Sequence, residues 1–230
     1  MPLNKSKGNM YSFVTHTHSH LGGKCSHECV YCYVQDMATR FPVMREKYLG
    51  SIRILDKELS VKYGKDKTIF IEHCNDLFAS SVSGDLIASI LAHCCGWPKN
   101  TYVFQTKNPE RYFSWLRDMP ENHILGVTIE TNRCMANISK APSPELRVEA
   151  MVELPGRKFV TIEPVLDFDV DVLVDWICAI DPEFLNLGAD SKDNYLPEPT
   201  VEKISQLVQK LKKLGIDLRE KHNLQRLKLK

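Results

Sequence analysis

Three cysteines within eight residues constrain this chain more than any other feature of its sequence. They occur in the stretch Cys25-Ser26-His27-Glu28-Cys29-Val30-Tyr31-Cys32, with the spacing Cys-x-x-x-Cys-x-x-Cys. A short loop with this spacing can wrap three thiolates around one metal centre. Cysteine thiolates are the usual ligands of iron–sulfur clusters, and three of them on a four-iron cluster leave one iron open to another molecule. The sequence therefore predicts a metal centre held by Cys25, Cys29 and Cys32.

A structural zinc site is the first alternative. Sites of that kind usually have four protein ligands, contributed by two separate pairs. No second pair follows in this sequence, because Cys94 and Cys95 are adjacent and the other cysteines stand alone (Cys74, Cys134 and Cys178). These five residues are interpreted as small buried side chains. His27 could serve only as a local fourth ligand, so the spacing favours a cluster over zinc.

Composition narrows the class of protein. A chain of 230 residues with 43% hydrophobic and 26% charged residues is ordinary for a globular domain, and we expect one domain over residues 1–230. The net charge of +1 argues against a protein that grips nucleic acid through bulk electrostatics. No stretch resembles a signal peptide or a membrane span. The expected location is the cytoplasm, whose reducing conditions suit thiolates that bind iron.

Predicted strands and helices alternate along the chain. Apolar and β-branched runs predict strands over 11–16, 68–71, 101–105, 124–129, 159–162 and 184–187. Helical patterns are expected over 33–48 with a break at Pro42, and over 85–94, 109–116, 144–154, 170–180 and 201–214. Such alternation predicts an α/β fold with parallel strands and outer helices. Six units cannot complete an eight-unit barrel, so a partial barrel and a doubly wound sheet both remain open.

The cysteine spacing, with an aromatic residue before the third cysteine, resembles the signature of the radical S-adenosylmethionine (radical SAM) enzymes. Resemblance to this family implies a partial (β/α)6 TIM-like barrel and a 4Fe-4S cluster on Cys25, Cys29 and Cys32. It also implies that the fourth iron binds S-adenosylmethionine, whose reductive cleavage gives a 5'-deoxyadenosyl radical that abstracts hydrogen from a substrate. An external electron donor of the flavodoxin or ferredoxin type would be required.

Four further stretches resemble an uncharacterised phage and prokaryotic subgroup related to spore photoproduct lyase. They are Thr15-His16-Thr17, Asn75-Asp76-Leu77-Phe78, Gln105-Thr106-Lys107-Asn108-Pro109-Glu110-Arg111 and Gly126-Val127-Thr128-Ile129-Glu130. This resemblance covers nearly the whole chain. It implies a second partner, because genes of the subgroup often stand beside one for a "three-Cys-motif partner" protein.

Polar residues at the ends of the predicted strands are the candidate cofactor ligands, because parallel strands present their sites at their carboxyl ends. By resemblance, Tyr31 packs near the adenine, and Asp76 replaces the family's Gly-Gly-Glu-Pro stretch in binding the ammonium group. Lys107 could contact the carboxylate, and Glu130 with Asn132 the ribose. Glu163 could contact the cofactor or the substrate. One or two of the alternating His16, His18 and His20 are expected to line the cluster cavity.

The substrate is not determined by the sequence, and no catalytic residue is assigned. An open barrel suits a nucleobase flipped out of DNA or RNA, in which case a basic cluster would meet the phosphates (Lys210, Lys212, Lys213, Arg226, Lys228 and Lys230). A small heterocycle is the alternative substrate. A non-catalytic module, in which a metal staples a loop for docking to a partner, is the alternative function.

Overall fold

One curved, mostly parallel sheet forms the centre of the computed structural model, which describes residues 3–192 and 194–228. Its strands, in spatial order, are β1 (Asn4–Lys5), β2 (His16–His18), β5 (Thr68–Ile71), β6 (Thr101–Thr106), β7 (His123–Thr128), β8 (Lys158–Ile162), β9 (Phe184–Leu187) and β10 (Leu218–Glu220). All neighbours are parallel except β1, which pairs antiparallel with β2. Within the described residues β1 and β10 do not pair, so the barrel is open between its edges.

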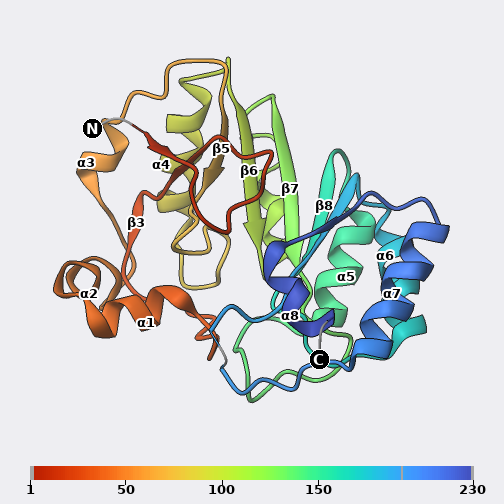
Figure 1. Ribbon diagram of the computed structural model, residues 1–230. Coiled ribbons are helices and arrows are strands. Elements are labelled where there is room, and N and C mark those ends of the chain that lie inside the picture. The colour runs from red at the N-terminus through yellow and green to blue at the C-terminus, as the bar shows by residue number, and fades with distance from the viewer. Residues whose placement is uncertain (1–2, 193, 229–230) are drawn as a thin grey trace.

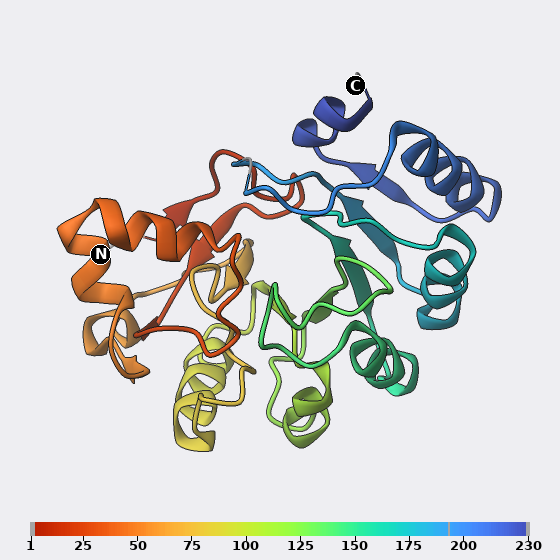
Figure 2. The same cartoon turned by 90° about the horizontal axis from the view of Figure 1, so that it is seen from below.

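Helices cover the outer face of this sheet (Figure 1 and Figure 2). They are α4 (Gly84–Cys95), η1 (Pro109–Trp115), α5 (Pro144–Glu153), α6 (Val170–Ile180) and α7 (Val201–Lys213). Each connects one strand to the next, as parallel pairing requires. Side-chain caps fix two helix starts: Ser143 accepts from Leu146 N and Thr200 from Lys203 N. The partial (β/α)6 barrel with parallel strands and outer helices is confirmed.

Shorter elements extend the barrel near its two ends. After β2, strand β3 (Leu21–Gly22) pairs with β4 (Arg53–Ile54), and the intervening chain forms α1 (Tyr33–Arg40) and α2 (Pro42–Tyr48). The short helix α3 (Asp56–Leu59) follows β4, and η2 (His222–Leu224) and α8 (Gln225–Lys228) follow β10. Phe41 separates α1 from α2 because the backbone before a proline avoids the helical conformation.

The alternation of side chains along each strand divides the apolar core in two. Residues such as Ile69, Phe104 and Val160 face the helices in the larger cluster. Their neighbours in sequence face the barrel interior in a second cluster (Phe70, Val103, Ile124, Phe159 and Phe184). Because successive side chains of a strand point to opposite faces, both layers follow from the apolar runs in the sequence. Aromatic residues thus fill the end of the barrel where the strands begin.

The predicted first strand over 11–16 is wrong in position, since the strand is β2 at His16–His18. Tyr11 and Phe13 instead lie inside the barrel, stacked with ring centroids 5.5 Å apart, and Phe13 contacts the ring of Phe184 at 4.9 Å. The aromatic pattern therefore reflects burial in the second cluster rather than strand pairing. The N-terminal segment also reaches the β10 side, where Lys221 Nζ lies 4.8 Å from the Tyr11 ring centroid.

The other predicted strands match β5 to β9, and β10 is a further parallel strand. The segment over 109–116 is helical but adopts the tighter 3-10 form. His18 and His20 are buried on the outer side of the sheet beside Tyr63 and His93, not around the cysteines. Among the described residues no helix is long and apolar enough to cross a membrane.

Candidate functional site

The cysteine loop runs from the end of β3 to the start of α1 and lies over the carboxyl ends of the strands. Cys25, Cys29 and Cys32 are all partly buried free thiols. Burial, followed by the charge of Asp76 and the two neighbouring thiols, raises the pKa of Cys25 to about 12. Burial also raises the pKa of Cys32. Burial therefore limits the contact of the Cys25 and Cys32 sulfur atoms with water.

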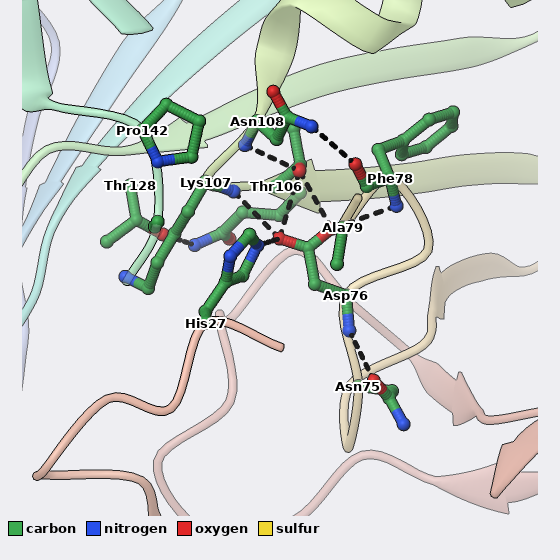
Figure 3. Close-up of polar contacts among 12 residues, drawn as sticks. His27, Asn75, Asp76, Phe78, Ala79, Thr106, Lys107, Asn108, Thr128 and Pro142 are labelled. Carbon is green, nitrogen blue, oxygen red and sulfur yellow. Dashed lines mark hydrogen bonds and ion pairs between the residues drawn. The ribbon is translucent and has the colours of Figure 1, made fainter. Parts of the chain in front are cut away.

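Asp76 anchors this loop to the end of β6 (Figure 3). His27 Nε2 lies 2.8 Å from Asp76 Oδ2, which also accepts a 2.8 Å hydrogen bond from the backbone N–H of Lys107. The hydroxyl of Thr106 donates to the same carboxylate at 2.7 Å, and Phe78 N donates to it at 2.9 Å. Burial alone would raise the pKa of Asp76, but His27 and these donors outweigh burial and lower it. Asp76 is therefore an ionised anchor.

Glu130, just beyond β7, is the centre of a buried ion network. Its side chain is 0% exposed, and it lies 2.5 Å from Lys107 Nζ and 2.7 Å from Arg147 Nη1. Burial opposes ionisation of Glu130, but Lys107 and Arg147 prevail and lower its pKa to about 2. The hydroxyl of Tyr31 donates to Glu130 Oε1. Glu130 thus ties the cysteine loop to β7, and the two cations leave this network with a net positive charge.

A second segment, in the connection between β7 and α5, covers the cysteine loop. Val30 N donates to Ile138 O at 3.0 Å, and Lys140 N donates to His27 O at 2.7 Å. Between these two backbone bonds lies Ser139, which is 7% exposed and places its Oγ 3.2 Å from Cys29 Sγ. The segment is therefore held in register with the cysteines.

Glu163 lies at the end of β8 and binds residues from both ends of the chain. Lys221 Nζ lies 2.7 Å from Glu163 Oε2, while Asn9 and Asn223 each donate to Oε1 at 2.9 Å. A Cβ on Gly188 would come within 2.8 Å of Glu163 Oε1. Glycine at this position therefore lets the Glu163 carboxylate lie where it binds Lys221 and Asn223. Lys221, which directly follows β10, therefore lies at the same rim as the end of β8.

Neutral polar side chains line the inner face below this rim. The Tyr11 hydroxyl lies 2.8 Å from Gln105 Oε1 and 2.9 Å from Thr161 Oγ1, and Gln105 Nε2 donates to Thr128 Oγ1 at 2.7 Å. Gln105, Thr128 and Thr161 lie two or four residues after the inward-facing Val103, Ile124 and Phe159 of the same strands. Because side chains alternate along a strand, these three also face the barrel interior. The interior is therefore apolar where the strands begin and polar where they end.

The cysteine loop leaves one buried polar atom without a partner. Ser26 Oγ is buried without a hydrogen-bond partner, and an orphaned buried hydroxyl in this loop fits a site where a cofactor supplies the partner.

The structure brings most of the predicted cofactor residues to one rim, and their roles stay predictions. Tyr31, Asp76, Lys107 and Glu130 converge on the cysteine loop through the contacts above. Asn132 lies apart and accepts a 2.9 Å bond from Asp169 N, whereas Glu163 stands with Lys221. Ser139 and Arg147 were missed, because their partners are distant in sequence, and His27, considered only as a local metal ligand, instead contacts Asp76. The one local sign that Arg147 is buried is its helical spacing, because it lies four residues before Met151 and next to Val148 on the apolar face of α5.

The open, mostly parallel barrel has the same fold as solved structures of radical SAM enzymes. A structure of spore photoproduct lyase complexed with dinucleoside spore photoproduct has a TM-score of 0.58 and 14% identity, covering 90% of this chain and 63% of that one. A structure of a variant of the same enzyme has a TM-score of 0.61 and 11% identity, and the match covers 95% of this chain and 80% of that one. The structure of Streptococcus suis SuiB bound to the precursor peptide SuiA has a TM-score of 0.60 and 9% identity, and the match covers 94% of this chain and 51% of that one.

The chain belongs to the family described as protein of unknown function (DUF5131), whose model matches residues 11–180. No curated protein matches the chain. The chain spans slightly less than two thirds of several of the spore photoproduct lyase structures, at 63% in the first. Lys221 and Asn223 lie beyond the segment that the family model matches.

Proposed function

We propose that this protein is a radical SAM enzyme that binds a 4Fe-4S cluster through Cys25, Cys29 and Cys32. The observation that carries the proposal is the cysteine loop itself, fixed at the carboxyl ends of parallel strands in a fold shared with radical SAM enzymes. Two of those neighbours are described with bound S-adenosylmethionine. When bound, the cluster would pass one electron to S-adenosylmethionine, and the resulting 5'-deoxyadenosyl radical would abstract hydrogen from the substrate.

The surrounding residues would position this loop rather than react. Asp76 has both carboxylate oxygens bonded to its own chain, and Glu130 has both bonded to Lys107 and Arg147. Saturated in this way, they suit loop anchoring better than direct contact with ammonium or ribose. Lys107 is 14% exposed and its ammonium remains the better candidate for the cofactor carboxylate. A metal-stapled docking module would have no need of this buried network.

Reduction would come from outside the chain. Val30, between two of the cysteines, is 58% exposed, so a protein can approach the loop closely. Lys24 and Lys140 flank this point and share the carboxylate of Glu28, which leaves a local excess of positive charge. An acidic electron donor of the flavodoxin or ferredoxin type fits this surface. A three-Cys-motif partner protein and a cytoplasmic location belong to the proposal on resemblance alone.

For the substrate, the structure favours a small polar molecule over a polymer. The N-terminal segment crosses the barrel interior toward β10 and fills its apolar end, which leaves the polar rim as the reactive surface. Most residues of the proposed phosphate-binding cluster also have partners of their own, since Lys210 pairs with Asp171, Lys212 and Lys228 with Glu220, and Arg226 with Glu198. Lys230 lies outside the described residues. Nucleic acid is therefore the second candidate, supported by the neighbour that binds a dinucleoside.

Anaerobic reconstitution with iron and sulfide tests the proposed function. Wild-type protein should take up about four irons per chain and release 5'-deoxyadenosine from S-adenosylmethionine under reduction. Cys29→Ala should abolish both. Cys178→Ala should change neither, because Cys178 lies on the exposed surface of α6 and not in the core position that its sequence context predicted. Full loading of the wild-type protein with zinc, and no iron, would overturn the proposal in favour of the docking module.

A further inference from the structure

We propose that Ser139 is a positioning residue that donates a hydrogen bond to the cluster-bound sulfur of Cys29 and thereby raises the reduction potential of the cluster. This inference rests on the proposed function. Its starting point is the 3.2 Å distance between Ser139 Oγ and Cys29 Sγ, which joins residues 110 positions apart in the chain. Hydrogen bonds to the sulfur ligands are among the factors that set the potential of iron–sulfur clusters.

The surrounding backbone holds the hydroxyl in place. Ser139 lies between Ile138 and Lys140, whose backbone groups bond to Val30 and His27 of the cysteine loop at 3.0 and 2.7 Å. Ala141 N donates to Ser139 Oγ at 3.2 Å, so one lone pair of the hydroxyl is already occupied. With 7% exposure, Ser139 meets little competing water. The loop therefore fixes the position of Ser139 Oγ beside Cys29 Sγ, whereas the hydroxyl proton can still turn.

A serine hydroxyl carries one proton, and two acceptors lie within its reach. These are Cys29 Sγ at 3.2 Å and the carbonyl oxygen of His27 at 3.3 Å. When Cys29 is a thiol, its own proton can point to Ser139 Oγ while the hydroxyl donates to His27. A cluster-bound thiolate has no proton and carries negative charge, so it becomes the stronger acceptor. The hydroxyl then turns to the sulfur.

Such a bond favours the reduced cluster, because reduction adds negative charge that spreads onto the sulfur ligands. Removing the hydroxyl should therefore shift the midpoint potential to a more negative value. A residue that merely closed the loop would change stability or iron retention instead, and would leave the potential of the loaded cluster unchanged.

The test is a redox titration of the reconstituted protein, followed by electron paramagnetic resonance in the absence of S-adenosylmethionine. Ser139→Thr and Ser139→Val form a matched pair, equal in volume and different in the hydroxyl. The threonine variant should keep the wild-type potential, and the valine variant should titrate at a more negative one. Asn137→Ala, exposed in the same segment, should leave the potential unchanged. Ser139→Ala repeats the hydroxyl loss with a smaller side chain, should valine fail to keep the cluster.

The outcomes separate this inference from the proposed function. A wild-type protein that assembles no 4Fe-4S cluster overturns the proposed function and the inference with it. Loaded valine or alanine variants with the wild-type potential overturn the inference alone. Equal negative shifts in the threonine and valine variants also overturn it, because side-chain volume rather than the hydroxyl would then set the potential.

Discussion

His27 Nε2 and Asp76 Oδ2 lie 2.8 Å apart although 49 residues separate them in the chain. This contact joins the middle of the cysteine loop to the connection that follows β5. Asp76 in turn accepts the backbone N–H of Lys107 at the end of β6. One carboxylate therefore fixes the loop relative to two neighbouring strands, so the sheet determines where the cysteine loop lies.

Asp76→Asn should weaken both folding and cluster retention. The amide keeps the shape of the side chain but loses the charge that His27, Thr106 and two backbone donors stabilise. Breaking a buried charged contact of this kind costs about 3 kcal/mol. Urea unfolding of the iron-free protein measures this loss, and iron analysis after desalting measures retention. Asp66→Asn, in a surface pair with 75% side-chain exposure, should stay within about 0.5 kcal/mol of wild type. Equal stabilities of the two variants would remove Asp76 from its anchoring role.

Glu130→Gln should destabilise the iron-free protein by about 3 kcal/mol, because it leaves Arg147, with 1% exposure, as a buried charge without a full counter-charge. The matched control is Glu183→Gln. Glu183 pairs with Arg157 at 2.7 Å, but both side chains are at least 40% exposed, so the expected loss is below about 1 kcal/mol. Urea unfolding of both variants measures the two losses in the free energy of unfolding. A loss at Glu130 no larger than at Glu183 would show that the network contributes little.

The stability of the fold should fall steeply in acid, and Glu130 should account for part of the fall. Its pKa is lowered from 4.5 in a free chain to about 2 in the folded protein. A lowered pKa means that the unfolded chain binds the proton first, so the stabilisation is complete above pH 4.5 and is lost as pH falls toward 2. The free energy of unfolding, measured between pH 2 and 5, should drop less steeply for Glu130→Gln than for wild type. Parallel curves would contradict the prediction.

Local patterns predicted much of this structure, and contacts between distant residues were the part they could not predict. The strands over Thr68–Ile71 and Phe184–Leu187 were found because short apolar runs between turn residues reflect burial on both faces of a sheet. The run that contains Tyr11 and Phe13 has a similar apolar pattern, yet these two residues fill the end of the barrel instead of forming a strand. Such a pattern reflects burial, which does not require strand pairing. The thiols were evident from spacing alone.

The residues that hold the cysteine loop in place were hidden for a different reason. Glu130 binds Arg147 from 17 residues away, and Ser139 reaches Cys29 across 110. Nothing near Ser139 in the sequence distinguishes it from an ordinary loop serine, since its role depends on where the barrel brings the two connections together. His27 was likewise considered only as a local fourth metal ligand, because its partner Asp76 is 49 positions away in the sequence.

Binding to nucleic acid should be weak and only slightly dependent on salt. Each phosphate contact contributes about −0.9 to the slope of log affinity against log salt on duplex DNA, and about −0.7 on single strands. The basic residues of α7 and α8 offer few such contacts, because Lys210 pairs with Asp171 while Lys212 and Lys228 share Glu220. Fluorescence anisotropy with duplex and single-stranded oligonucleotides between 50 and 200 mM salt should therefore give slopes shallower than about −1.

Removing the competing acids provides the control for this measurement. Asp171→Asn and Glu220→Gln together would release three lysines, so the double variant should bind more tightly and with a steeper slope if the face is accessible to phosphate. Adding Lys210→Gln and Lys228→Gln to the double variant should then flatten the slope again, while release of 5'-deoxyadenosine stays unchanged, because both lysines lie in surface ion pairs. A wild-type slope of about −3 or steeper corresponds to several phosphate contacts, and would make nucleic acid, rather than a small polar molecule, the favoured substrate.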